Sequence, residues 1–203
     1  LRLVRARAGS RDSAAYSSMA SASPSTHSLT TRPPPRTTRR SCRSSTNSSV
    51  CGTCLKVDGP KGSINVRVVD QCPGCKKGDL DFSESAFKKI AEPIQGRVPI
   101  TWIAIPCAMT TPVTYHVKEG SSKFWTAVSV RNHKLPIAKL EMQKGGAFVD
   151  APRRDYNYFV LETGVQSDAP FRVRITANDG QVLEDELPGP QPGKLFTGAK
   201  NFN

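Results

Sequence analysis

Short apolar runs separated by turn residues are the feature that most restricts the fold of this chain. Beyond residue 112, strand-like runs follow one another, and turn sequences such as Lys144-Gly145-Gly146 and Asn178-Asp179-Gly180 separate several of them. Short runs at this spacing are typical of the strands of a β-sandwich. The expected strands are 113–117, 125–130, 137–142, 156–161, 171–176 and 181–187.

Residues 51–107 have the same character, with one helical segment. Strands are expected at 55–57, 63–69 and 98–105, and Trp102 in the last of these alternates like a core residue. The apolar spacing of 83–90 predicts a short helix that Ser83 caps. With 108–112 as a linker, the sequence predicts two all-β domains, at 51–107 and 113–203. No window approaches the roughly 18 apolar residues of a membrane span.

The first fifty residues differ in composition from the rest of the chain. They contain nine Arg, no Lys and one acidic residue, and they show no periodic apolar pattern. One interpretation is a disordered basic tail, because so few apolar residues cannot offset the entropy of ordering. The other is an out-of-frame reading of the N-terminal part of the first domain. Most of the formal charge of +12 lies in this segment, so the charge is weak evidence for a nucleic-acid-binding protein.

All six cysteines precede residue 108, and they allow two interpretations. Cys51, Cys54, Cys72 and Cys75 form two Cys-x-x-Cys pairs at the spacing of a four-cysteine zinc site, as in a nucleic-acid-binding zinc ribbon. However, Cys54 leads directly into an expected strand, and Cys107 has no place in a ribbon. Six cysteines in a small domain favour disulfides in an exported protein, so neither a metal nor a cofactor is expected.

Several motifs resemble those of expansins, in that family's order and spacing. In the first domain they are Cys51-Gly-Thr-Cys-Leu-Lys-Val, Asn65-Val-Arg-Val-Val-Asp-Gln-Cys-Pro and Gly78-Asp-Leu-Asp-Phe; in the second they are Tyr115-His-Val-Lys-Glu-Gly, Val130-Arg-Asn-His-Lys and Asp155-Tyr-Asn-Tyr-Phe. The second set is similar to bacterial members. The resemblance implies an all-β protein: a six-stranded double-psi β-barrel related to family 45 glycoside hydrolases, then an immunoglobulin-like, cellulose-binding β-sandwich.

The resemblance also implies a function, since expansins loosen cellulose networks without hydrolysing them. It implies a secreted, extracellular monomer that binds cellulose, and xyloglucan or other β-glucans, in the plant cell wall; neither a nucleic acid nor a membrane is an expected partner. It implies disulfides Cys54–Cys107 and Cys72–Cys75, which leaves Cys51 for an upstream cysteine. The chain departs from the family at Cys72, where an aromatic residue is expected, and in residues 1–50, where the family's N-terminal Thr cannot be placed.

Asp70 and Asp81 stand at motif positions in the first domain. An inverting glycosidase needs a carboxylic acid and a carboxylate base about 6.5–9.5 Å apart. By the resemblance, Asp81 takes the place of the acid, whereas the base has no evident counterpart. The groove is therefore expected to bind and strain a glucan without cutting it. The alternatives are a family 45-like endoglucanase and, for both aspartates, a role in capping turns.

The second domain offers a candidate binding surface. Cellulose presents flat, weakly polar sugar faces, which rigid aromatic rings bury with little loss of side-chain entropy. By the resemblance, Phe124, Trp125 and Tyr156 form the family's aromatic row, and Lys118 adds a polar contact. Adjacent strand residues point to opposite faces, so Phe124 and Trp125 share a surface only at a strand start or a bulge. Otherwise Phe124 belongs to the core.

Overall fold

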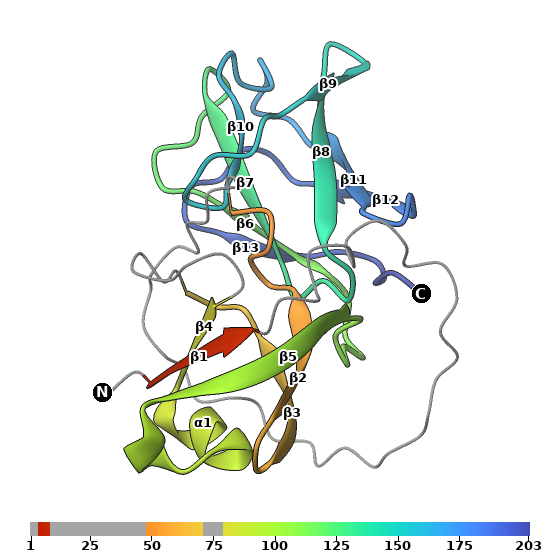
Figure 1. The fold of residues 1–203 in the computed structure, drawn as a ribbon. Coiled ribbons are helices and arrows are strands. Elements are labelled where there is room, and N and C mark those ends of the chain that lie inside the picture. Colours follow the sequence, from red (N-terminus) through yellow and green to blue (C-terminus); the bar gives the residue numbers. More distant parts are fainter. Residues whose placement is uncertain (1–3, 9–47, 71–78) are drawn as a thin grey trace.

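The computed structural model describes residues 4–8, 48–70 and 79–203, without the side chains of 4–8. Two β-rich lobes follow one another along the chain (Figure 1). The first lobe contains β1 to β5 and α1, and the second contains β6 to β13. Within the described ranges, none of the helices has the length and hydrophobicity needed to cross a bilayer.

The first lobe is built on a sheet whose described strands have the order β3-β2-β5-β1-β4. Antiparallel pairs join β3 to β2 and β2 to β5, while β1 is parallel to β5 and antiparallel to β4. The strands are β1 (Val4–Ala8), β2 (Cys54–Gly59), β3 (Gly62–Arg67), β4 (Asp79–Phe82) and β5 (Arg97–Ile105). β1 lies within the first fifty residues, where the sequence predicted no strand. Its sequence, Val-Arg-Ala-Arg-Ala, has little of the β-branched and aromatic content that marks a strand.

Helix α1 (Glu84–Ile90) covers the core of this sheet and begins where the sequence predicted. The Ser83 side chain accepts a hydrogen bond from the amide of Ala86 at 3.4 Å, which satisfies one of the unpaired amides of the first turn. Phe87 and Ile90 are fully buried against the strands. A 3₁₀ turn, η1 (Pro93–Gln95), leads from the helix into β5.

The second lobe consists of two antiparallel four-stranded sheets in the described residues (Figure 1). Their inner faces share one apolar core. One sheet has the order β10-β7-β6-β13, formed by β6 (Thr114–Val117), β7 (Thr126–Arg131), β10 (Phe159–Leu161) and β13 (Leu195–Thr197). The other has the order β12-β11-β8-β9, formed by β8 (Ile137–Lys144), β9 (Ala147–Asp150), β11 (Phe171–Ala177) and β12 (Val182–Leu187).

Two local predictions differ from the structure. The expected strand 156–161 is reduced to β10, because Asn157 adopts a left-handed φ of 59° and closes a turn just before it. Trp102 is half-buried rather than fully inside the core, since it packs against one side of the first lobe's apolar cluster and remains partly exposed on the other.

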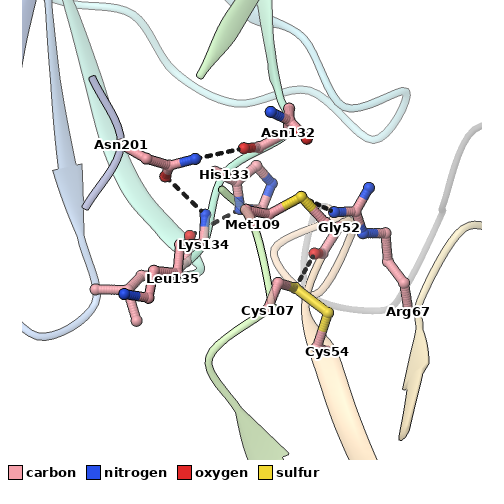
Figure 2. The surroundings of a disulfide bond; sticks show 10 residues. All are labelled: Gly52, Cys54, Arg67, Cys107, Met109, Asn132, His133, Lys134, Leu135 and Asn201. Atoms are coloured by element: carbon pink, nitrogen blue, oxygen red, sulfur yellow. Dashed lines mark hydrogen bonds between the residues drawn. A yellow bond between two sulfur atoms is a disulfide. The ribbon is translucent and has the colours of Figure 1, made fainter. Parts of the chain in front are cut away.

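A disulfide joins Cys54 and Cys107 near the contact between the lobes (Figure 2). This pairing confirms the one implied by the family resemblance. It also shows that the zinc-ribbon alternative is wrong, because a sulfur in a disulfide cannot serve as the thiolate ligand that zinc requires. The expected pair Cys72–Cys75 lies outside the described residues, and Cys51 is buried.

Candidate functional site

Phe124 and Trp125 lie at a tight turn that leads into β7. Ser122 and Trp125 exchange backbone hydrogen bonds of 2.7 and 3.2 Å, so Lys123 and Phe124 are the two central residues of a hairpin-like turn. Phe124 and Trp125 were expected to share a surface only at a strand start or a bulge, and this turn immediately before β7 is such a strand start. Phe124 projects from the tip of the turn with 66% of its surface exposed, which excludes the core alternative.

Trp125 immediately precedes β7, and its side chain faces away from the core. Val128 and Val130 point inward and are buried in the sandwich core. Side chains alternate along a strand, so Trp125, three residues before Val128, faces the outer surface of the sheet. Its indole Nε1 donates a hydrogen bond of 2.9 Å to Glu162 Oε2, and Arg154 pairs with the other carboxylate oxygen of Glu162.

Tyr156 belongs to a turn that precedes β10. The Asn157 amide donates to the Arg154 carbonyl at 3.0 Å, and the Arg154 amide donates to the Tyr158 carbonyl at 2.8 Å. The ring centroids of Tyr156 and Tyr158 lie 5.8 Å apart. Tyr156 is half-buried, so part of its ring is supported by the protein and part is open to a ligand.

Tyr158 and His116 extend this outer face between β10 and β6. The Tyr158 hydroxyl lies 2.7 Å from His116 Nδ1 in a hydrogen bond. Partial burial raises the pKa of Tyr158, so its hydroxyl keeps its proton throughout the neutral range. Tyr158 and His116 are polar groups next to the predicted aromatic row, and neither was predicted from the sequence. The Tyr-x-Tyr spacing of residues 156 and 158 was a signal that could have identified Tyr158.

Lys118 lies on the same outer face. Tyr115 and Val117 are buried in the core, so the intervening His116 and the following Lys118 face outward. The Lys118 amide donates to the Ala127 carbonyl at 2.9 Å, which places it beside β7. The structure thus brings Lys118 and Trp125 onto one sheet face, with Tyr156 on the adjoining turn and Phe124 at its edge.

The carboxylates of the first lobe occupy different surroundings. Asp81 is half-buried within β4, and Asp70 is exposed three residues beyond β3. These strands stand at opposite ends of the pairing order, and residues 71–78 between them lie outside the described part. Ser83 is the N-cap residue of α1, two residues after Asp81. Asp79, not selected from the sequence, is buried and pairs with Arg97 at 3.3 Å.

The first lobe reaches the turn that carries Tyr156. Ser48 Oγ donates to the Asp155 carbonyl, and Arg153 donates to the Ser48 carbonyl at 3.1 Å. The Arg153 guanidinium also stacks 4.5 Å from the Phe159 ring centroid. These contacts fix the end of the aromatic row against the first lobe. Within 48–70 and 79–203, no cluster of three or more His, Cys, Asp or Glu side chains is arranged to hold a metal ion.

Comparison with known proteins places this geometry in a family. The double-psi β-barrel family described as lytic transglycolase matches residues 36–102. Expansin-YoaJ of Bacillus subtilis is 40% identical over 155 residues, covering 73% of this chain and 65% of that protein. The crystal structure of the apo expansin of Clavibacter michiganensis superposes with a TM-score of 0.74 at 32% identity, covering 99% of this chain and 97% of that one.

The chain belongs to the expansin family. Its described strands therefore form the family's two units, a double-psi β-barrel followed by a β-sandwich, and the predicted all-β fold is confirmed. A mutant of the Clavibacter michiganensis expansin, crystallised in complex with cellohexaose, superposes with a TM-score of 0.71 at 34% identity over 81% of this chain and 82% of that one.

This expansin spans only part of its curated relatives. It covers 65% of the Bacillus subtilis protein and 48% of Expansin-like protein 3 of Dictyostelium discoideum, which is 28% identical over 166 residues and matches 77% of this chain. Family membership thus defines the fold, while activity and ligands have to be argued from the site itself.

Proposed function

We propose that this expansin binds cellulose and related β-glucans, and loosens their lateral contacts without hydrolysing them. The observation that carries the proposal is the outer face of the sheet β10-β7-β6-β13, with Trp125 at one end and the Tyr156 turn at the other. A relative of 34% identity has been crystallised with cellohexaose, a short cellulose chain, and this supports a glucan as the ligand.

The chemistry of this face suits a flat sugar polymer. Aromatic rings cover the weakly polar faces of glucose units, while Lys118, His116 and the Tyr158 hydroxyl offer hydrogen bonds to the sugar hydroxyls. Part of each aromatic ring is held by the protein, so little conformational entropy is lost on binding. Xyloglucan shares the same glucan backbone and is a further ligand of this proposed surface.

The loosening step belongs to the first lobe. Asp81, half-buried in β4, is the proposed contact for a glucan hydroxyl or glycosidic oxygen, and Asp70 is the second proposed polar contact. Hydrolysis requires a general base on the far side of the bond from the acid. We assign no such base, so the strain exerted on a bound chain separates it from its neighbours instead of cutting it.

The proposed setting is extracellular, in the plant cell wall, with the protein acting as a monomer. The Cys54–Cys107 disulfide supports the extracellular setting, because disulfides persist in oxidising compartments and are rare in the cytosol. One sandwich face in contact with a polymer does not require a second copy of the chain.

Trp125→Ala is the direct test of the binding surface. Removing the indole should weaken binding to microcrystalline cellulose by about 2 kcal/mol, roughly 30-fold in Kd, because its stacking area is lost. The measurement is a depletion isotherm with purified protein. Phe148→Ala is the matched control, since Phe148 stacks 3.8 Å from the Arg174 guanidinium on the other sheet and should leave binding unchanged.

Two results would contradict the proposed surface. One is an unchanged isotherm for Trp125→Ala in a protein that still unfolds cooperatively at the parent temperature. The other is an equal loss of binding for Phe148→Ala, which would mean that both sheets, or only general folding, decide the affinity.

A further inference from the structure

Glu162 joins the two aromatic ends of the binding face through its two carboxylate oxygens. One oxygen accepts the Trp125 indole N–H at 2.9 Å, and the other pairs with the Arg154 guanidinium. We propose that Glu162, held by Arg154, is a positioning residue that fixes the Trp125 ring relative to Tyr156 for binding to a glucan. This proposal rests on the glucan-binding function proposed above.

The three groups come from separate parts of the chain. Trp125 immediately precedes β7, and Glu162 directly follows β10, which pairs with β7. Leu161 and Thr126 are partners in register, so the next residues along, Glu162 and Trp125, are cross-strand neighbours. Arg154 lies before β10 on the loop side. The sheet therefore holds Glu162 next to the indole, and the loop brings a cation to the same carboxylate.

Arg154 is also the first residue of the turn that carries Tyr156. Its carbonyl accepts from the Asn157 amide at 3.0 Å, and its own amide donates to the Tyr158 carbonyl at 2.8 Å. The side chain of Arg154 thus connects the backbone that supports Tyr156 with the carboxylate that holds Trp125. Any rotation of the indole away from Glu162 breaks the hydrogen bond that its ring nitrogen donates.

The geometry leaves the indole free to bind. The hydrogen bond uses the Nε1 edge of the ring, so the apolar ring faces stay available for stacking on a sugar. An indole on a sheet surface has several accessible rotamers, and a charge-assisted hydrogen bond selects one of them before the ligand arrives. Such pre-organisation raises affinity by lowering the entropy lost on binding.

The same contacts contribute little to folding stability. Glu162 and Arg154 have side chains that are 58% and 42% exposed, and exposed ion pairs are screened by water. We therefore expect the loss of Glu162 to change cellulose affinity and indole orientation, but to leave the unfolding temperature almost unchanged. A merely structural role would instead lower stability.

The experiment compares Glu162→Ala, Glu162→Gln and Arg154→Ala by cellulose isotherm, unfolding temperature and the indole N–H signal of Trp125 in ¹⁵N NMR. Trp125 and Trp102 are the two tryptophans of the chain, so Trp102→Phe assigns the signal. Glu162→Ala should weaken binding about three- to tenfold and shift the signal, since a solvent-exposed hydrogen bond that orders the indole is lost. Arg154→Ala should act in the same direction, and Glu162→Gln, which keeps an acceptor, should lie closer to the parent.

Glu184→Ala is the matched control, because Glu184 forms comparable ion pairs with Arg172 and Arg174 on the opposite sheet. It should change neither the isotherm nor the indole signal. Parent-like binding and an unmoved signal in Glu162→Ala would overturn the inference, as would equal effects of Glu184→Ala. These outcomes leave the proposed function intact if Trp125→Ala still loses binding, whereas unchanged binding in Trp125→Ala rejects the binding surface itself.

Discussion

Gly164 supports the turn that presents Phe124 and Trp125. The backbone of this glycine lies against the turn, and a Cβ built on it would come closer than 3.0 Å to the carbonyl of Lys123. The neighbouring amide of Gln166 donates to that same carbonyl at 2.8 Å. The absence of a side chain at residue 164 is therefore what lets the loop after β10 press against the aromatic turn.

Gly164→Ala should be more harmful than the same change at Gly145. Both glycines have a left-handed φ, +61° and +56°, so both variants carry a backbone penalty of about 1 kcal/mol. Gly145 has open space around it, whereas residue 164 meets backbone atoms, so Gly164→Ala should lose about 2 kcal/mol more. Urea unfolding of the two variants measures the difference. Equal losses would mean that the turn moves aside at little cost.

At this scale the sequence could point to Trp125, Tyr156 and Phe124 only through the family motifs that contain them. It could not point to Glu162 and Arg154. A charged residue next to an exposed strand is normally just solvated, and only the cross-strand register and the turn at 154–157 bring these two charges to the indole.

The disulfide is the clearest constraint at the level of the elements. Cys54 opens β2, its partner in register is Ile105 of β5, and Cys107 follows that strand by two residues. The bond thus fastens the ends of two strands that are already paired. The two cysteines are 53 residues apart in sequence, so the bond closes a loop of the chain that contains β3, β4 and α1.

The double variant Cys54→Ser, Cys107→Ser should lose about 4 kcal/mol of unfolding free energy. The reason is that the open chain regains the entropy of a loop of this length, and the estimate follows the chain-entropy model. Urea unfolding of parent and variant gives the value. Reducing agent should then lower the stability of the parent more than that of the double variant. Equal stability of the variant and the parent would mean that the disulfide does not stabilise the fold.

The longer elements were predictable from their own sequence, and several of the short ones were not. β5, β8, β11 and α1 each repeat their apolar positions often enough to show a pattern. β4, β9 and β13 have only three or four residues, and their pairing partners, not their own sequence, make them strands. The parallel contact of β1 with β5 depends on chain topology, which local patterns do not contain.

Over the whole molecule, the two lobes meet around the buried His133. Figure 2 shows its imidazole between Gly52 of the first lobe and the backbone of Leu135, whose carbonyl lies 2.7 Å from Nδ1. A Cβ on Gly52 would lie under 3.0 Å from the imidazole. Burial lowers the pKa of His133 to about 4, and the positive charges of Arg67 and Arg153 act in the same direction.

This pKa predicts acid sensitivity of the folded protein. In the unfolded chain histidine binds a proton near pH 6.5, whereas folded His133 stays neutral down to about pH 4. The unfolded state therefore binds more protons in this window, and stability falls as the pH falls through it, by up to about 3 kcal/mol. His133→Gln should flatten this part of the stability curve measured by urea unfolding from pH 7 to pH 4. An unchanged slope would assign the acid sensitivity to other groups.

We propose that the protein separates glucan chains without cutting them. The most direct measurement is the extension of a cellulose-rich plant wall strip held under constant load, with new reducing ends counted in the same bath. The parent protein should extend the strip without producing reducing ends, and Asp81→Asn should extend it much less. Sustained release of reducing ends by the parent, abolished in Asp81→Asn, would contradict the claim and identify a hydrolase.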